Sequence, residues 1–265
     1  MSGPGSATGG LFDISGKAAL VTGGSRGIGA MIARGLLQAG ARVIVSSRKA
    51  GELQESAREL AAIGDCEAIP GDISSPEGAA ALAAATRERF QKLHILVNNA
   101  GATWGAPLEE FPASGWDRTS HTNVEGVFHL TVALLPALRA AADAGDPARV
   151  VTIGSIDGLR APQLENYSYS ASKAAVHMLT RHLAKRLAPE HITVNAIAPG
   201  PFPSKMTAFM LGDPQRRELV EQHVPLARIG RPDDAAGLTI FLCSRAGSYL
   251  TGTVIPLDGG ITGCN

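Results

Sequence analysis

The sequence has few cysteines and no excess of charge of either sign. Its three cysteines, Cys66, Cys243 and Cys264, are odd in number, widely spaced, and without a CxxC pair or a histidine at ligand spacing. Neither a disulfide framework nor a zinc site is expected. Lys and Arg together number 24, as do Asp and Glu, so the chain has no overall positive field for a nucleic acid or an anionic membrane. Any anion site must be local.

Long hydrophobic runs are also absent. No apolar stretch approaches the roughly 18 residues needed to cross a bilayer, and the N-terminus lacks a basic segment followed by an apolar one. We therefore expect a cytoplasmic protein without a membrane or nucleic-acid partner. Residues 1–12, beginning MSGPGSATGG, are expected to be a flexible lead-in. Residues 13–265 are expected to form a single domain, because no linker or repeat divides them.

The sequence does contain a regular alternation of short apolar runs and helical patterns. The predicted strands are residues 17–22, 41–47, 66–70, 94–98, 149–154, 192–197 and 253–257. The segments between them repeat apolar residues at spacings of three and four, which is typical of helices. Several strands are apolar on both faces, as in a parallel sheet that helices cover on two sides. The sequence predicts an α/β doubly wound sheet, with ligands bound beyond the carboxyl ends of its strands.

A glycine-rich loop follows the first predicted strand. The segment TGGSRGIGA places Gly23, Gly27 and Gly29 ahead of a helix that starts near Ile28. Glycine lets the backbone approach a ligand closely, and free N–H groups at a helix start favour a pyrophosphate. Glycines alone would also fit a tight turn without a ligand, but the strand–turn–helix context favours an anion site.

The end of the second predicted strand lacks the acidic residue that often binds the adenosine ribose. Ser47 and Arg48 stand there instead, and Arg26 lies within the glycine loop. Cations attract the nearly doubly charged 2′-phosphate of NADP(H), so this pattern favours NADP(H) over NAD(H). The alternative is that both arginines are solvated surface charges.

A tyrosine and a lysine are spaced for one helix face in the segment YSYSASK (167–173). Tyr169 and Lys173 lie four residues apart, about 40° around a helix, whereas Tyr167 points elsewhere and is assigned to packing. A phenol can donate a proton to a reduced carbonyl, and a nearby ammonium would lower its pKa. Ser155, after the fifth strand, could bind a carbonyl oxygen, and Asn123 lies in a helical pattern. Each feature alone also fits an ordinary structural role.

Together and in this order, these features resemble the short-chain dehydrogenase/reductase family from Lys17 to Gly260. The matching motifs are TGGSRGIG, GDIS, NNAG, Asn123, Ser155, YSASK and APG. The resemblance implies a Rossmann fold of about seven parallel strands and a homotetramer or homodimer. It implies cofactor contacts from Gly23, Ser25, Arg26, Gly27, Ile28, Gly29, Ser47, Arg48, Asp72, Ile73, Asn99, Ala100, Gly101, Tyr169, Lys173, Pro199, Gly200, Phe202 and Ser204.

The resemblance also implies roles for the catalytic residues. Ser155 and Tyr169 would hold the carbonyl oxygen while NADPH delivers hydride, Lys173 would bind the nicotinamide ribose, and Asn123 would hold a proton-relaying water. The loop PGPFPSKMT departs from the family pattern, because Phe202 and Ser204 stand where an aliphatic residue and a threonine are usual.

The substrate side is expected to be apolar. Segments 102–111, 156–167 and 202–211 supply Trp104, Leu159, Met206, Phe209 and Met210, with a lid near 202–222. Within the family the sequence looks most like bacterial NADPH-dependent β-ketoacyl reductases, including the rhamnolipid-associated kind, and a 3-oxoacyl thioester is the expected substrate. The alternatives are a broad ketone or secondary-alcohol dehydrogenase acting on steroids, polyols or xenobiotic carbonyls, and a non-catalytic NADP(H) sensor.

Overall fold

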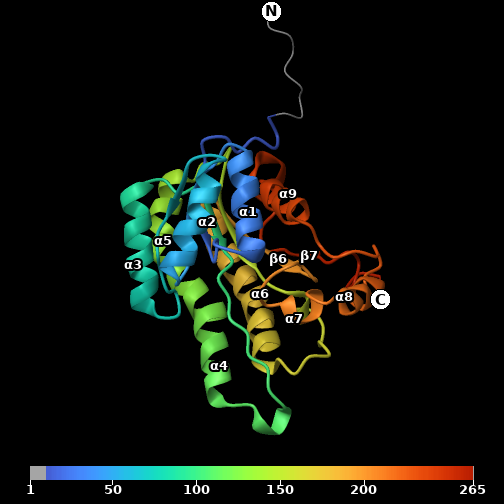
Figure 1. The fold of residues 1–265 in the computed structure, drawn as a ribbon. Coiled ribbons are helices and arrows are strands. Elements are labelled where there is room, and N and C mark those ends of the chain that lie inside the picture. The colour runs from blue at the N-terminus through green and yellow to red at the C-terminus, as the bar shows by residue number, and fades with distance from the viewer. Residues whose placement is uncertain (1–9, 265) are drawn as a thin grey trace, which may run out of the picture.

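A seven-stranded parallel sheet forms the centre of the protein in a computed structural model that describes residues 10–264 (Figure 1). The strands are β1 (Ala18–Thr22), β2 (Arg42–Ser46), β3 (Cys66–Ala68), β4 (Ile95–Asn98), β5 (Ala148–Ile153), β6 (Ile192–Pro199) and β7 (Val254–Leu257). Their order is β3-β2-β1-β4-β5-β6-β7, and every neighbouring pair is parallel. The predicted fold class is confirmed.

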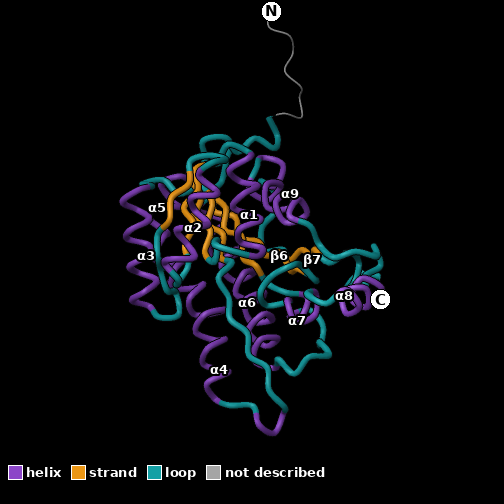
Figure 2. Tube along the Cα trace, in the orientation of Figure 1, coloured by secondary structure: helices purple, strands orange, loops and turns teal. Residues whose placement is uncertain are grey.

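Helices cover both faces of this sheet (Figure 2). The longer helices are α1 (Gly27–Gln38), α2 (Ala50–Ala61), α3 (Pro76–Arg89), α4 (Ala113–Ser120), α5 (Gly126–Ala141), α6 (Tyr167–Leu187), α8 (Pro214–Gln222) and α9 (Pro232–Cys243). The short helices are η1 (Leu108–Glu110), η2 (His121–Glu125), η3 (Ile156–Gly158), η4 (Ala188–Glu190), α7 (Ala208–Leu211) and η5 (Arg245–Gly247). Helices α1, α2 and α9 pack on one face, and α3, α5 and α6 on the other.

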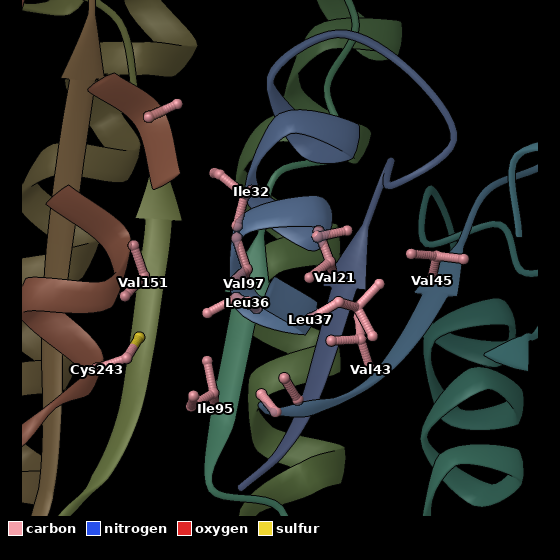
Figure 3. Packing of buried hydrophobic residues seen from close by; sticks show 14 of the residues in the cluster. Val21, Ile32, Leu36, Leu37, Val43, Val45, Ile95, Val97, Val151 and Cys243 are labelled. Carbon is pink, nitrogen blue, oxygen red and sulfur yellow. The ribbon is translucent and has the colours of Figure 1, made fainter. Parts of the chain in front are cut away.

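Two apolar cores result, one on each side of the sheet. In the first, Ile32, Leu36 and Leu37 of α1 pack against strand side chains such as Val21 and Val97 (Figure 3). Such positions are almost fully buried, and burying one such side chain contributes roughly 1.5–3 kcal/mol. The strands are therefore apolar on both faces because both faces are covered.

The helical run Ala113–Ala141 joins α4, η2 and α5, and η2 is a single turn of π-helix. By length and composition alone, the run is long and apolar enough to span a bilayer. Its buried side chains Leu130, Leu134 and Leu138 lie in the second core, on the sheet. Packing on the sheet therefore accounts for part of this apolar composition, whereas Phe128 and Val132 of the same run are exposed.

The start of the described chain lies against η5. The backbone N–H of Ala246 donates to the carbonyl of Leu11 at 3.0 Å, and the side chains of Leu11 and Phe12 are exposed. Residues 1–9, most of the predicted lead-in, lie outside the described residues, as does the side chain of Met210.

Candidate active site

A cavity of about 1070 Å³ opens at the carboxyl edge of the sheet, where the strand order reverses between β1 and β4. It is lined by residues at or just after the strand ends, among them Thr22, Asn99, Ile153 and Pro199. Every residue of the predicted site lines this cavity except Gly29 and Asn123. The topology thus brings segments that are distant in the sequence to one edge.

The glycine loop forms the floor of one end of the cavity. Gly23 and Gly27 have positive φ values of 63° and 54°, a conformation that other L-residues adopt at a cost. A Cβ on Gly23 would lie 2.7 Å from the Asn99 side chain, and one on Gly29 would collide with the Gly23 carbonyl. Gly29 therefore packs against the backbone of the loop, whereas Gly23 and Gly27 line the cavity.

Four hydrogen bonds connect Thr22 and this loop to the segment after β4, one of them from the backbone N–H of Ala100 to the Thr22 hydroxyl at 3.0 Å. Asn99 donates through Nδ2 to the carbonyls of Thr22 and Gly23, at 2.8 and 3.1 Å. The Thr22 hydroxyl accepts from the backbone N–H of Asn99 at 3.0 Å. Thr22 was not among the predicted site residues, and its hydroxyl and Asn99 fix the two cavity walls relative to each other.

The end of β2 is polar and cationic. The hydroxyl of Ser47 is buried and has no hydrogen-bond partner in the described part of the chain, while Arg48 is exposed at the rim. Arg26 forms an ion pair with Glu52, in the first turn of α2, at 2.9 Å. Glu52 was not among the predicted site residues, because an acid was expected only at the strand end.

Ser155, Tyr169 and Lys173 come together at the other end of the cavity. The Lys173 Nζ lies 5.6 Å from the centroid of the Tyr169 ring and donates to the carbonyl of Ile153 at 2.7 Å. The Ser155 hydroxyl caps η3 by accepting from the backbone N–H of Asp157 at 3.1 Å. A strand end and the first two turns of α6 thus supply the three polar groups.

Tyr167 lies elsewhere, as its position on the helix predicts. Its hydroxyl donates to Glu165 at 3.2 Å, and its ring meets Phe111 edge to face with centroids 5.5 Å apart. Tyr167 does not line the cavity, so packing is the role that the contacts give it.

Burial controls the titration of the polar groups. It raises the pKa of the Tyr169 phenol to about 12, with the Ser155 hydroxyl acting in the opposite direction and the Asp157 carboxylate in the same one. Burial also lowers the pKa of Lys173 to about 8. The pKa of the phenol is therefore raised overall, against the expectation of a lowered value, because desolvation of the phenol is the largest effect.

Asn123 lies in the π-helical turn η2 and does not line the cavity. Its amide accepts from the backbone N–H of Ala102 at 2.8 Å and donates to the Ala102 carbonyl and the Ser172 hydroxyl, each at 2.9 Å. A π-turn is often found at functional sites. Here the turn aims the amide at the segment after β4 and at α6, beside Lys173.

The segment after β6 covers the cavity. Pro199 ends β6, Gly200 follows it, and the Phe202 side chain is 2% exposed in the core. The Ser204 and Thr207 hydroxyls lie 3.0 Å apart, and that of Thr207 donates to the Phe202 carbonyl at 2.6 Å. The altered loop is therefore internally bonded.

The predicted substrate-side residues divide into two groups. Trp104, Met206 and Phe209 line the cavity, whereas Leu159 is exposed outside it. The polar residues Asp157 and Arg160, which were not named among the predicted substrate-side residues, also line the cavity. Because Asp157 follows Ser155 so closely, its position next to the phenol could have been suspected from the sequence.

The glycine loop and the Ser–Tyr–Lys group on this sheet define a dinucleotide-dependent oxidoreductase. A family model described as enoyl-(acyl carrier protein) reductase matches residues 23–262, and the chain belongs to the short-chain dehydrogenase/reductase family.

The chain is 53% identical over 249 residues to the rhamnolipids biosynthesis 3-oxoacyl-[acyl-carrier-protein] reductase of Pseudomonas aeruginosa, covering 94% of this chain and 97% of that protein. It is 37% identical over 254 residues to a galactitol 2-dehydrogenase (L-tagatose-forming) of Cereibacter sphaeroides, covering 95% and 97%. The solved Pseudomonas aeruginosa RhlG/NADP active-site complex superposes with a TM-score of 0.93 at 52% identity, covering 96% of this chain and 99% of that one.

Proposed function

We propose that this protein reduces the keto group of a 3-oxoacyl thioester with NADPH. The observation that carries the proposal is the meeting of Ser155, Tyr169 and Lys173 in the same cavity as the glycine loop. The similarity to a 3-oxoacyl reductase over nearly the whole of both chains supports the substrate class.

The described residues fit a dinucleotide phosphate. The positive-φ glycines leave backbone N–H groups at the start of α1 for the pyrophosphate. The unpartnered hydroxyl of Ser47 and the guanidinium groups of Arg26 and Arg48 suit a 2′-phosphate. When bound, NADPH supplies the hydride that the carbonyl carbon receives.

The chain's own residues handle the carbonyl oxygen. With a pKa of about 12, Tyr169 keeps its proton at neutral pH and donates it to that oxygen as hydride arrives at the carbon. Ser155 would donate a hydrogen bond to the same oxygen, and Lys173 would hold the ribose end of the cofactor. Asn123 bonds to Ala102 and to Ser172, next to Lys173, and would from there support a water that returns protons towards Lys173.

The lining supports an acyl substrate. Trp104, Met206 and Phe209 give the substrate end an apolar wall that suits a hydrocarbon chain. A second candidate is oxidation of a polyol or another secondary alcohol, which the polar side chains of Asp157 and Arg160 and the likeness to galactitol 2-dehydrogenase favour. A cofactor sensor without turnover is disfavoured, because all three catalytic groups are in place.

The activity test compares four reactions of the purified protein. NADPH absorbance is followed with an acetoacetyl thioester, a crotonyl thioester and a simple ketone, and NADP⁺ reduction is followed with galactitol. The proposal expects the acetoacetyl thioester to have the highest kcat/KM. Turnover of the crotonyl thioester alone would indicate enoyl reduction, and preference for galactitol would indicate the second candidate. NADPH binding without any turnover would favour the sensor.

We further propose a cytoplasmic, single-domain enzyme in which residues 202–222 act as a lid over the cavity. Met206, Phe209 and Leu219 of that segment line it, which supports a covering role. Exposed Phe128 and Val132, one turn apart on α5, support assembly into a homo-oligomer. Light scattering of the wild type and of Val132→Glu tests the assembly, which the charged variant should weaken.

A further inference from the structure

We propose that Lys205 and Glu52 set the protein's preference for a 2′-phosphorylated cofactor, with Glu52 acting as an internal counter-ion that the 2′-phosphate displaces. The inference rests on the proposed use of NADPH and adds two residues to it. Lys205 belongs to the segment between β6 and α7, and Glu52 to the first turn of α2.

Glu52 is the centre of a cation cluster at the cavity rim, made of Arg26, Lys49 and Lys205. Lys49 Nζ lies 2.9 Å from Glu52 Oε1, and Arg26 Nη1 lies 2.9 Å from Glu52 Oε2. Lys205 Nζ lies 3.5 Å from Glu52 Oε1. All four residues line the cavity. They come from the glycine loop, the β2–α2 connection, α2 and the segment after β6, so the cluster exists only in the folded chain.

The charges of this cluster do not balance. Three cations surround one carboxylate, Arg48 adds a fourth cation to the same cavity wall, and the nearby Ser47 hydroxyl is buried without a partner. A 2′-phosphate carries close to two negative charges and three acceptor oxygens. It would therefore be a better partner for these cations than a single carboxylate, whereas an unphosphorylated ribose offers them no charge.

The exchange is feasible because the pairs are weak. The side chains of Glu52, Arg26, Lys49 and Lys205 are 38%, 50%, 68% and 67% exposed, and exposed ion pairs contribute little. The hydrogen bond from Lys49 and the neighbouring cations lower the pKa of Glu52, so it is ionised at neutral pH and competes with an incoming phosphate. Glu52 therefore lowers the affinity for every ligand that must displace it.

Lys205 connects the cluster to the segment that covers the cavity. The neighbouring Ser204 lies over the glycine loop, where a Cβ on Gly27 would be 3.2 Å from the Ser204 Cβ. A phosphate held by Lys205 would thus also hold Ser204 and the residues after it over the cavity. The 2′-phosphate would then favour the covered arrangement at the substrate end, so cofactor choice and lid closure are coupled.

The test measures binding of 2′,5′-ADP and 5′-AMP by calorimetry, so that the nicotinamide and turnover play no part. Glu52→Gln should bind 2′,5′-ADP about fivefold more tightly, and Lys205→Gln about fivefold more weakly, with 5′-AMP changed less than about twofold in both. The matched controls are Glu55→Gln, exposed on α2 outside the cavity, and Lys185→Gln, exposed on α6. Neither control should alter the ratio of the two affinities.

The outcomes separate this inference from the proposed function. A wild type that does not prefer 2′,5′-ADP over 5′-AMP would overturn the NADPH assignment itself. A wild type with that preference, together with Glu52→Gln and Lys205→Gln variants that match their controls, would overturn only the inference. Weaker binding of 2′,5′-ADP by Glu52→Gln would also overturn it.

Hydrogen exchange tests the coupling to the lid. In the wild type, 2′,5′-ADP should slow amide exchange in residues 202–211 more than 5′-AMP does. That difference should disappear in Lys205→Gln. Equal protection by both nucleotides in the wild type would refute the coupling.

Discussion

Tyr169 and Tyr167 lie two residues apart at the start of α6, yet their surroundings differ completely. Tyr169 faces the cavity beside Lys173, whereas Tyr167 is 37% exposed and contacts Glu165 and Phe111. Helical geometry alone predicts this separation, because positions four apart share a face and positions six apart do not. The pKa of the phenol is not predictable in the same way, because it depends on burial by distant segments.

The buried ammonium of Lys173 lowers the free energy of unfolding. Its pKa is lowered to about 8, so the folded protein binds this proton more weakly than the unfolded chain, and a buried ammonium persists below that pH. The free energy of unfolding should therefore rise as the pH increases from 8 to about 10.5, because the folded protein loses this proton before the unfolded chain does. Lys173→Met should lose activity but gain about 2 kcal/mol in free energy of unfolding at pH 7 by urea denaturation without cofactor.

The control for this stability prediction is Lys185→Met, an exposed lysine on the same helix, which should change the free energy of unfolding by less than about 0.5 kcal/mol. A Lys173→Met variant less stable than the wild type would show that the hydrogen bond to Ile153 outweighs the desolvation of the ammonium.

The carboxylate of Asp157 raises the pKa of the Tyr169 phenol. After burial, its negative charge is a further effect that raises the pKa of Tyr169. Asp157→Asn should therefore lower that pKa, and the alkaline rise of NADP⁺-dependent oxidation of a 3-hydroxyacyl thioester should move down by roughly half a pH unit. Glu165→Gln, whose carboxylate contacts Tyr167 instead, should leave the profile in place. A shift to higher pH in Asp157→Asn would contradict this assignment.

At the scale of elements, all seven strands begin and end within two residues of their predicted limits. Strands such as β1 and β5 are buried along their whole length and mostly apolar because both faces are covered, so a short hydrophobic run in the sequence is enough to predict them. The π-turn η2 was not predicted, since no local pattern distinguishes it from α-helix. The Glu52 cluster was missed for a related reason: Lys205 reaches it only because the segment after β6 crosses the glycine loop.

The glycine loop has no room for a side chain at Gly29. A Cβ on Gly29 would collide with the Gly23 carbonyl and the Asn99 side chain, so the turn would have to open. Gly29→Ala should lower the free energy of unfolding by about 2 kcal/mol and weaken NADPH binding at least about tenfold. These are measured by urea denaturation and by cofactor fluorescence.

The matched control is Gly237→Ala in α9, where nothing lies within 4 Å of the added Cβ. It should raise the free energy of unfolding by about 0.5–1 kcal/mol through helix propensity and leave NADPH binding unchanged. Equal behaviour of the two alanine variants would show that Gly29 has no special role in the loop.

At the scale of the molecule, a charge-balanced chain concentrates its cations where one ligand needs them. Lys plus Arg equal Asp plus Glu overall, yet Arg26, Arg48, Lys49 and Lys205 all line the cavity that also contains Tyr169. The parallel sheet makes this possible by directing its strand ends to one edge. One end of the cavity thus suits a phosphorylated nucleotide, and the other can protonate a carbonyl.

The most direct measurement is NADPH oxidation by Tyr169→Phe with an acetoacetyl thioester, beside NADPH binding by the same variant. We predict binding within about twofold of the wild type and a kcat at least about 100-fold lower, because only the proton donor is removed. Tyr167→Phe, whose ring lies outside the cavity, should retain near-wild-type turnover. Full activity in Tyr169→Phe would contradict the account.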